Sequence, residues 1–135
     1  MRLYHFTSTA HLPRILADGF LKVVESNMSR TREHAGPDVV WLTSRSEPAA
    51  HRGWAGGSAV DKTAIRFTVD IPDRDVHRWS EWARRRGIDQ KWMRALASTG
   101  GSASWYVVER VVSAGEWIEI MDVATGLLTP MPDAV

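Results

Sequence analysis

His5 and Thr7 are the first residues of the chain whose types and spacing could do chemistry. They lie in Leu3-Tyr4-His5-Phe6-Thr7, which has the apolar and aromatic residues of a short β-strand. An imidazole held close to a hydroxyl on one strand offers a fixed donor and acceptor, which suits the diol of a ribose. The competing interpretation is structural, because a histidine in an apolar strand is commonly a core residue with a satisfied hydrogen bond.

Motifs for several other chemistries are missing from the sequence. It contains no Walker-type phosphate loop, no Gly-x-Gly-x-x-Gly after a strand and no His-Glu-x-x-His. His34 and His51 stand apart from any pattern of metal ligands, so we expect no metal site. Ser44 lacks the Gly-x-Ser-x-Gly setting of a hydrolase nucleophile. The chain has no cysteine, which excludes disulfides and thiolate metal sites.

A short helix and several strands are predicted after His5, and their packing would position its side chain. Ser8 or Thr9 is predicted to cap a helix that has Pro13 in its first turn, and Gly19 to end that helix in a left-handed conformation. Apolar runs, continuous or alternating, predict later strands at residues 39–43, 64–71, 105–112 and 116–120.

Two helices are predicted between the strands at 64–71 and 105–112. The first is capped by Asp73 or Asp75 and closes at Gly87, with apolar residues spaced three to four apart at Val76, Trp79, Trp82 and Ala83. The second follows Asp89 and carries Trp92, Met93 and Leu96. We expect these tryptophans to be core residues rather than ligand contacts.

The length of 135 residues suits a single domain with one core. The mixed order of strands and helices predicts an α+β fold over residues 1–135. Polar stretches at residues 25–38 and 44–62 are predicted to be long loops, which are commonly functional or disordered. No signal-peptide pattern opens the chain, and no apolar run approaches the ~20 residues that span a bilayer. We therefore expect a soluble, cytoplasmic protein.

Three consecutive segments at the start of the chain form a recognisable pattern. They are Leu3-Tyr4-His5-Phe6-Thr7, His11-Leu12-Pro13-Arg14-Ile15-Leu16 and Asp18-Gly19-Phe20-Leu21. Together they resemble the opening of the DarT-like DNA ADP-ribosyltransferases, which has a Tyr-His-x-Thr strand, a Leu-Pro-x-Ile-Leu helix and a Gly-Leu stop. The resemblance implies an ADP-ribosyltransferase-like fold, with a small mixed or antiparallel split sheet and flanking helices. It also implies NAD as a substrate.

The resemblance assigns roles to individual residues. His5 matches the histidine that holds the adenosine-side ribose of NAD, and Phe6 and Thr7 lie beside it. The family's second motif is a strand with an aromatic residue and hydroxyl residues. The positions that match it more loosely are Trp41, Leu42, Thr43 and Ser44, followed by Arg45.

The third motif is a strand that bears the catalytic glutamate, and Glu109 is its candidate. If the strand is registered on Glu116 and the residues after it instead, Tyr106 falls nearest to that position and could not play the same part. Glu25 is the next carboxylate to consider. The competing interpretation makes Glu109 a strand-end carboxylate paired with a surface arginine.

The chemistry of NAD explains why these residue types are needed. Breaking the nicotinamide–ribose bond passes through an oxocarbenium-like centre, and a carboxylate hydrogen-bonded to the adjacent hydroxyl stabilises it. Trp41 or Tyr106 could pack on the cationic nicotinamide ring, although Trp41 is equally expected as a core indole. The arginines eligible to hold the pyrophosphate are Arg30, Arg32, Arg45 and Arg66.

Three functions remain open from the sequence. The first is transfer of ADP-ribose from NAD to a macromolecule. Its acceptor is expected to be a nucleic-acid base, DNA or RNA, bound through Arg74, Arg78, Arg84, Arg85, Arg86, Lys91 and Arg94. The second is a non-catalytic nucleotide- or nucleic-acid-binding module on the same scaffold, which Tyr106 in place of a glutamate would favour. The third is transfer of an RNA 2′-phosphate to NAD.

Overall fold

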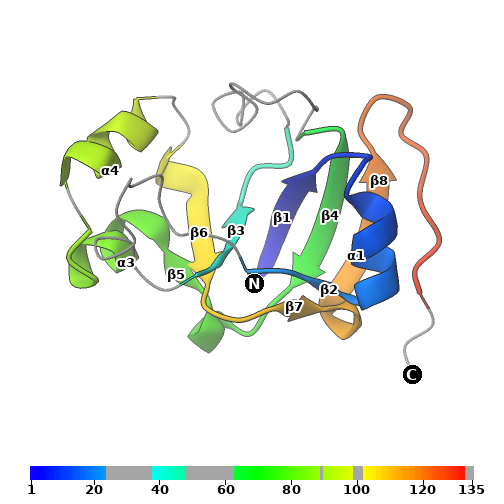
Figure 1. Cartoon of the computed structure of the whole chain (residues 1–135), viewed down its shortest axis with the longest axis horizontal. Coiled ribbons are helices and arrows are strands. Elements are labelled where there is room, and N and C mark those ends of the chain that lie inside the picture. The colour runs from blue at the N-terminus through cyan, green and yellow to red at the C-terminus, as the bar shows by residue number, and fades with distance from the viewer. Residues whose placement is uncertain (24–37, 48–62, 89, 99–101, 133–135) are drawn as a thin grey trace.

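The computed structural model describes residues 1–23, 38–47, 63–88, 90–98 and 102–132, apart from the side chains of residues 92, 95 and 96. The fold is α+β, as the mixed element order predicts, and is built on a six-stranded antiparallel sheet (Figure 1). The strand order is β5 (His77–Arg78), β6 (Trp105–Val108), β3 (Val40–Thr43), β1 (Arg2–Thr7), β4 (Ile65–Asp70) and β8 (Trp117–Asp122).

A second, two-stranded sheet joins β2 (Phe20–Leu21) to β7 (Val112–Ser113). It lies next to helix α1 (Leu12–Asp18), which β2 follows directly (Figure 1). The apolar residues of α1 and of these strands pack against one face of the large sheet, in a cluster that includes Leu3, Leu42 and Phe67. We call this the α1 face of the sheet.

The opposite face of the sheet is covered at its β6–β3 end by α3 (Trp79–Arg85), with Met93 of α4 (Gln90–Ala97) also in contact. Four large rings meet there, and we call this side the α3 face. The rings of Trp79 and Trp105 lie 5.1 Å apart in an edge-to-face arrangement, and Trp82 is 2% exposed. Val107 alternates with Tyr106 along β6, so each strand residue contacts only one of the two faces.

The structure corrects two predicted helix starts. α3 begins at Trp79 rather than after Asp73 or Asp75, because Asp73–Asp75 form a separate 3₁₀ turn and His77–Arg78 pair with β6. The cap of α1 is His11, not Ser8 or Thr9.

The predicted strand at 105–112 is also wrong in its length. β6 ends at Val108, the chain bends at Glu109 and Arg110, and β7 then pairs with β2 in the other sheet. Arg110 holds this bend, since its guanidinium contacts Glu116 at 2.7 and 2.9 Å and Asp75 at 2.9 Å. The β-type residues at 105–112 predicted one continuous strand, because a local sequence pattern does not reveal long-range ion pairs.

Gly19 ends α1 in a left-handed conformation with φ of 76°, as predicted. A Cβ at Gly19 or at Gly115 would meet no atom within 4 Å, but only Gly19 of the two has a positive φ. Gly19→Ala should therefore lower the free energy of unfolding by about 1 kcal/mol through backbone strain alone. Gly115→Ala, the matched control, should change it by less than ~0.5 kcal/mol. Urea unfolding of both variants measures the difference, and equal effects would contradict the explanation.

Candidate functional site

His5 lies at the weakest junction of the large sheet. β1 pairs with β4 at six register positions but with β3 at one, Tyr4 opposite Thr43. The His5 ring adds a second link, because its Nδ1 lies 2.8 Å from the backbone oxygen of Trp41. A carbonyl oxygen only accepts hydrogen bonds, so Nδ1 carries the proton and donates it. In the neutral ring, Nε2 is then left as an acceptor.

Burial keeps the His5 ring neutral. The ring is partly enclosed and stands edge-on to Phe67, with centroids 6.4 Å apart and an interplanar angle of 74°. Loss of solvent lowers the pKa of His5 below its usual 6.5, and the hydrogen bond to the Trp41 carbonyl opposes that shift only in part. A neutral imidazole with one fixed N–H, and with an acceptor that has no hydrogen-bond partner among the described residues, suits a neutral hydroxyl ligand.

The hydroxyl residues near His5 are mostly engaged in local structure. Thr7 is 8% exposed at the end of β1. Ser8, 1% exposed, has its Oγ 3.0 Å from Nδ1 of His11 and accepts the His11 backbone N–H at 3.3 Å. The Ser8–His11 pair was missed in the sequence, although a Ser-x-x-His spacing just before a helix is a usable signal.

The second predicted motif forms a buried polar link between β3 and the segment before β6. Thr43 Oγ1 donates to Ser104 Oγ at 3.2 Å and accepts from the Arg45 backbone N–H at 3.1 Å. The Ser44 backbone N–H donates to the Ser104 carbonyl at 3.0 Å. Ser104, which lies in a Gly/Ser-rich stretch, was not singled out in the sequence. These contacts fix the end of β3 next to the junction with β1.

Trp41 contributes its backbone, rather than its ring, to the surroundings of His5. Its ring lies 6.2 Å from Trp79 and 6.0 Å from Trp105, on the α3 face. His5 packs with Phe67 on the α1 face. The two rings therefore lie on opposite sides of the sheet, and the core-indole interpretation describes Trp41 better than a nicotinamide platform.

Glu109 is also separated from His5. It lies in the bend after β6, not in a strand as predicted, and its Oε1 accepts the Trp82 indole N–H at 2.6 Å. The same oxygen pairs with Arg86. The Trp82 hydrogen bond and Arg86 lower the pKa of Glu109 and keep the carboxylate charged. This carboxylate anchors α3, on the face of the sheet away from the imidazole.

The remaining site candidates divide between the two faces. Tyr106 packs with the α1-face cluster, the side on which His5 lies. Phe6 is opposite Arg66 across β1 and β4, and the Arg66 guanidinium lies 5.3 Å from the Tyr4 ring, so this group belongs to the α3 side. Glu25, Arg30 and Arg32 lie outside the described residues.

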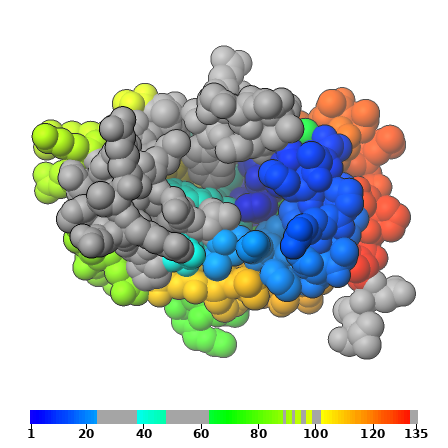
Figure 2. Space-filling model, in the orientation of Figure 1, coloured from blue at the N-terminus to red at the C-terminus, as the bar shows by residue number. Residues whose placement is uncertain are grey.

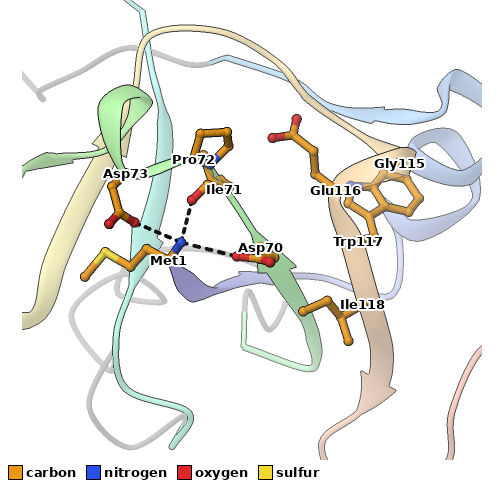
Figure 3. Close-up of a pocket in the computed structure, with 9 residues that line it drawn as sticks. All are labelled: Met1, Asp70, Ile71, Pro72, Asp73, Gly115, Glu116, Trp117 and Ile118. Carbon is orange, nitrogen blue, oxygen red and sulfur yellow. Dashed lines mark hydrogen bonds and ion pairs between the residues drawn. The ribbon is translucent and has the colours of Figure 1, made fainter.

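The surface is hollowed beside α1, with atoms of β1 and of residues 38–47 at the floor of the hollow (Figure 2). A separate open cavity of about 540 Å³ lies where β1 begins and β4 ends, lined by Met1, Asp70, Asp73 and neighbours (Figure 3). The Met1 amino group contacts both carboxylates there, at 3.2 and 3.1 Å. None of the predicted site residues lines this cavity.

The described part of the chain holds no group of three or more His, Cys, Asp or Glu side chains that could bind a metal ion. It also contains no helix long and apolar enough to cross a membrane.

The lowered pKa of His5 predicts a specific pH dependence of stability. The unfolded chain binds a proton near pH 6.5, which the folded chain resists, so stability is present above that pH and is lost as the pH falls toward the folded pKa. His5→Asn keeps a donor for the Trp41 carbonyl but does not titrate.

The free energy of unfolding of the wild type should therefore fall, relative to that of His5→Asn, by up to about 1.4 kcal/mol per pH unit below pH 6.5. Urea unfolding of both proteins at about pH 7 and about pH 5 measures this change. A difference that stays constant with pH would show that His5 titrates alike in the folded and unfolded states.

Glu109 should prove to be a structural anchor. Glu109→Ala leaves the buried Trp82 N–H without its acceptor and should lower the free energy of unfolding by about 1–3 kcal/mol. Glu109→Gln retains an acceptor oxygen and should cost less than Glu109→Ala. Glu47→Ala removes an exposed partner of Arg45 and is the control, with an expected effect within about 0.5 kcal/mol. Equal stability of all three variants would rule out the anchor.

Comparison with known proteins adds no relative to this geometry. No family model, no curated protein and no solved structure matches the chain. The resemblance to DarT-like ADP-ribosyltransferases therefore stays a prediction from the residues quoted above.

Proposed function

We propose that the chain binds NAD at the junction of β1 and β3 and transfers its ADP-ribose to a macromolecule, with a nucleic-acid base as the expected acceptor. The observation that carries this proposal is the state of His5. Its Nδ1–H is committed to the Trp41 carbonyl, which orients the ring and leaves Nε2 to accept a hydrogen bond from a ribose hydroxyl. The hollow beside α1 gives a ligand access to this side of β1 (Figure 2).

The environment of His5 favours a sugar over an anion. A neutral ring attracts no phosphate, but it pairs well with a hydroxyl that needs an acceptor. The backbone around it is rigid, since β1 is hydrogen-bonded to β4 along its whole length. Such fixed geometry reduces the ordering cost of holding a flexible dinucleotide.

The exposed arginines of α3 support a nucleic-acid acceptor. Arg84 and Arg85 follow one another in the last turn of α3, and Arg86 caps it. Arg86 is paired with Glu109, whereas Arg84 and Arg85 have no carboxylate within ion-pair distance in the described part of the chain. Exposed positive charge of this kind contributes sequence-independent attraction to a phosphate backbone.

The placement of Glu109 favours a second candidate, a module that binds a nucleotide without transferring it. Transfer needs a carboxylate at the reacting ribose, and Glu109 is held under α3 by Trp82 and Arg86. Glu25, the other carboxylate considered, lies outside the described residues. The transferase and the binding module share the NAD site, and they differ only in whether ADP-ribose is transferred.

Calorimetric titration with NAD tests the shared site. His5→Asn retains the Nδ1-type donor but removes the Nε2 acceptor, so it should weaken NAD binding by about tenfold while leaving the melting temperature near that of the wild type. His11→Asn, at the exposed histidine that caps α1, is the matched control and should bind NAD as the wild type does.

Labelled NAD then separates the two candidates. Incorporation of label into DNA, RNA or protein supports transfer, whereas binding without incorporation supports the module. If Glu109→Gln abolishes incorporation while the protein stays folded, Glu109 is the catalytic carboxylate; unchanged incorporation moves that role to Glu25. Absence of heat with millimolar NAD would count against both candidates.

A further inference from the structure

One row of side chains crosses the α1 face of the sheet from β5 to β1. Arg78 of β5 is opposite Tyr106 of β6, and Tyr106 is opposite Leu42 of β3. On the next strand Tyr4 is opposite Thr43, which places His5 beside Leu42 on the same face. Residues that are opposite in register share a face, so the row runs from a cation through a phenol and the fully buried Leu42 to an imidazole.

Arg78 is the charged end of this row. Its guanidinium carbon lies 5.8 Å from the centroid of the Tyr106 ring, and the residue is exposed. No carboxylate lies within ion-pair distance of it in the part of the chain that the structure describes. Arg110, by contrast, contacts both Glu116 and Asp75 through three short hydrogen bonds. Arg78 is therefore oriented by an aromatic ring while its N–H donors remain available to an anion.

Arg78 also differs from the other basic residues of its segment. The others lie in the Asp73–Asp75 turn, in α3, directly after α3 or in α4. Helix α3 packs on the face of the sheet away from His5. Among these described residues, Arg78 is the one that strand pairing connects to the face of His5. A ligand that contacts His5 would meet Arg78 before it met the cations of α3.

We propose that Arg78 and Tyr106 form the diphosphate subsite of the ligand that His5 holds by its ribose. The inference rests on the proposed function, since it extends the NAD site along the sheet. Three interstrand steps of ~4.8 Å place the Arg78 backbone about 14 Å from that of His5. The long Arg78 side chain shortens that span, and the Tyr106 hydroxyl adds a neutral donor between the two ends.

The charges of the row match the parts of a dinucleotide. The neutral His5 faces the uncharged sugar, and the permanently charged Arg78 faces the doubly anionic diphosphate. A ligand without phosphates should therefore gain nothing from Arg78. This separation of roles distinguishes a subsite from general electrostatic attraction.

The test compares NAD with adenosine, which has the same ribose and base but no phosphate, on the intact chain. Arg78→Gln should weaken NAD binding by about tenfold or more and leave adenosine binding unchanged. Arg85→Gln removes an exposed charge of α3 and is the matched control, expected to bind both ligands as the wild type does. Titrations at low and high salt remove the contribution of long-range attraction.

The titration results can overturn the subsite and the proposed function separately. Equal NAD affinity of Arg78→Gln and the wild type would overturn the subsite while leaving the His5 site intact. An equal loss in Arg85→Gln would also overturn it, because net charge would then explain the effect. If the wild type binds neither NAD nor adenosine, the proposed function fails first. Circular dichroism of both variants confirms that the comparison is made on folded protein.

Discussion

The hydrogen bond from His5 to the Trp41 carbonyl joins the two halves of this fold. β1 and β3 share one backbone register pair, so the imidazole supplies a link that the strand ladder lacks. The Trp41 ring belongs to the tryptophan cluster under α3, while the His5 ring packs with Phe67 on the α1 face. This side chain-to-backbone contact adds to the strand pairing that already holds both apolar clusters on one sheet. A protonated ring would be poorly tolerated there, which is why burial lowers the pKa of His5.

Ion pairs of Arg86 and Arg110 fasten the bends that follow α3 and β6. Arg110 ties the Asp73–Asp75 turn to the turn that precedes β8, and its guanidinium lowers the pKa of Glu116. Glu109 ties the bend after β6 to α3, because its carboxylate binds both Trp82 and Arg86. Both ion pairs flank the point where the chain leaves the large sheet for the small one. This arrangement explains why carboxylates that look available in the sequence are already engaged in the structure.

Local patterns in the sequence predicted much of the fold but little of its long-range pairing. Alternation at residues 64–71 and the left-handed Gly19 depend on neighbours in the chain, and both were placed correctly. The strand break after Val108 depends on Arg110 meeting Asp75, 35 residues away, and no periodicity reports such a contact. The separation of His5 from Glu109 likewise depends on contacts between residues that are far apart in the sequence. Which face a residue occupies is decided by register across strands, and the sequence does not contain that register explicitly.

The division of the sheet into two faces limits which functions the site residues can share. His5, Tyr106 and Arg78 are connected by register on the α1 face, whereas Trp41, Glu109 and the arginines of α3 lie with the other face. A single small ligand contacts one face of a sheet, so these two sets belong to different tasks. The α1 set suits recognition of a sugar and its phosphates. The α3 set combines a structural anchor with exposed positive charge, which suits a larger polyanion. In the proposed function, binding of a dinucleotide depends only on the α1 set, while transfer to a nucleic acid would require the ligand and the acceptor to meet at an edge of the sheet where both faces are accessible.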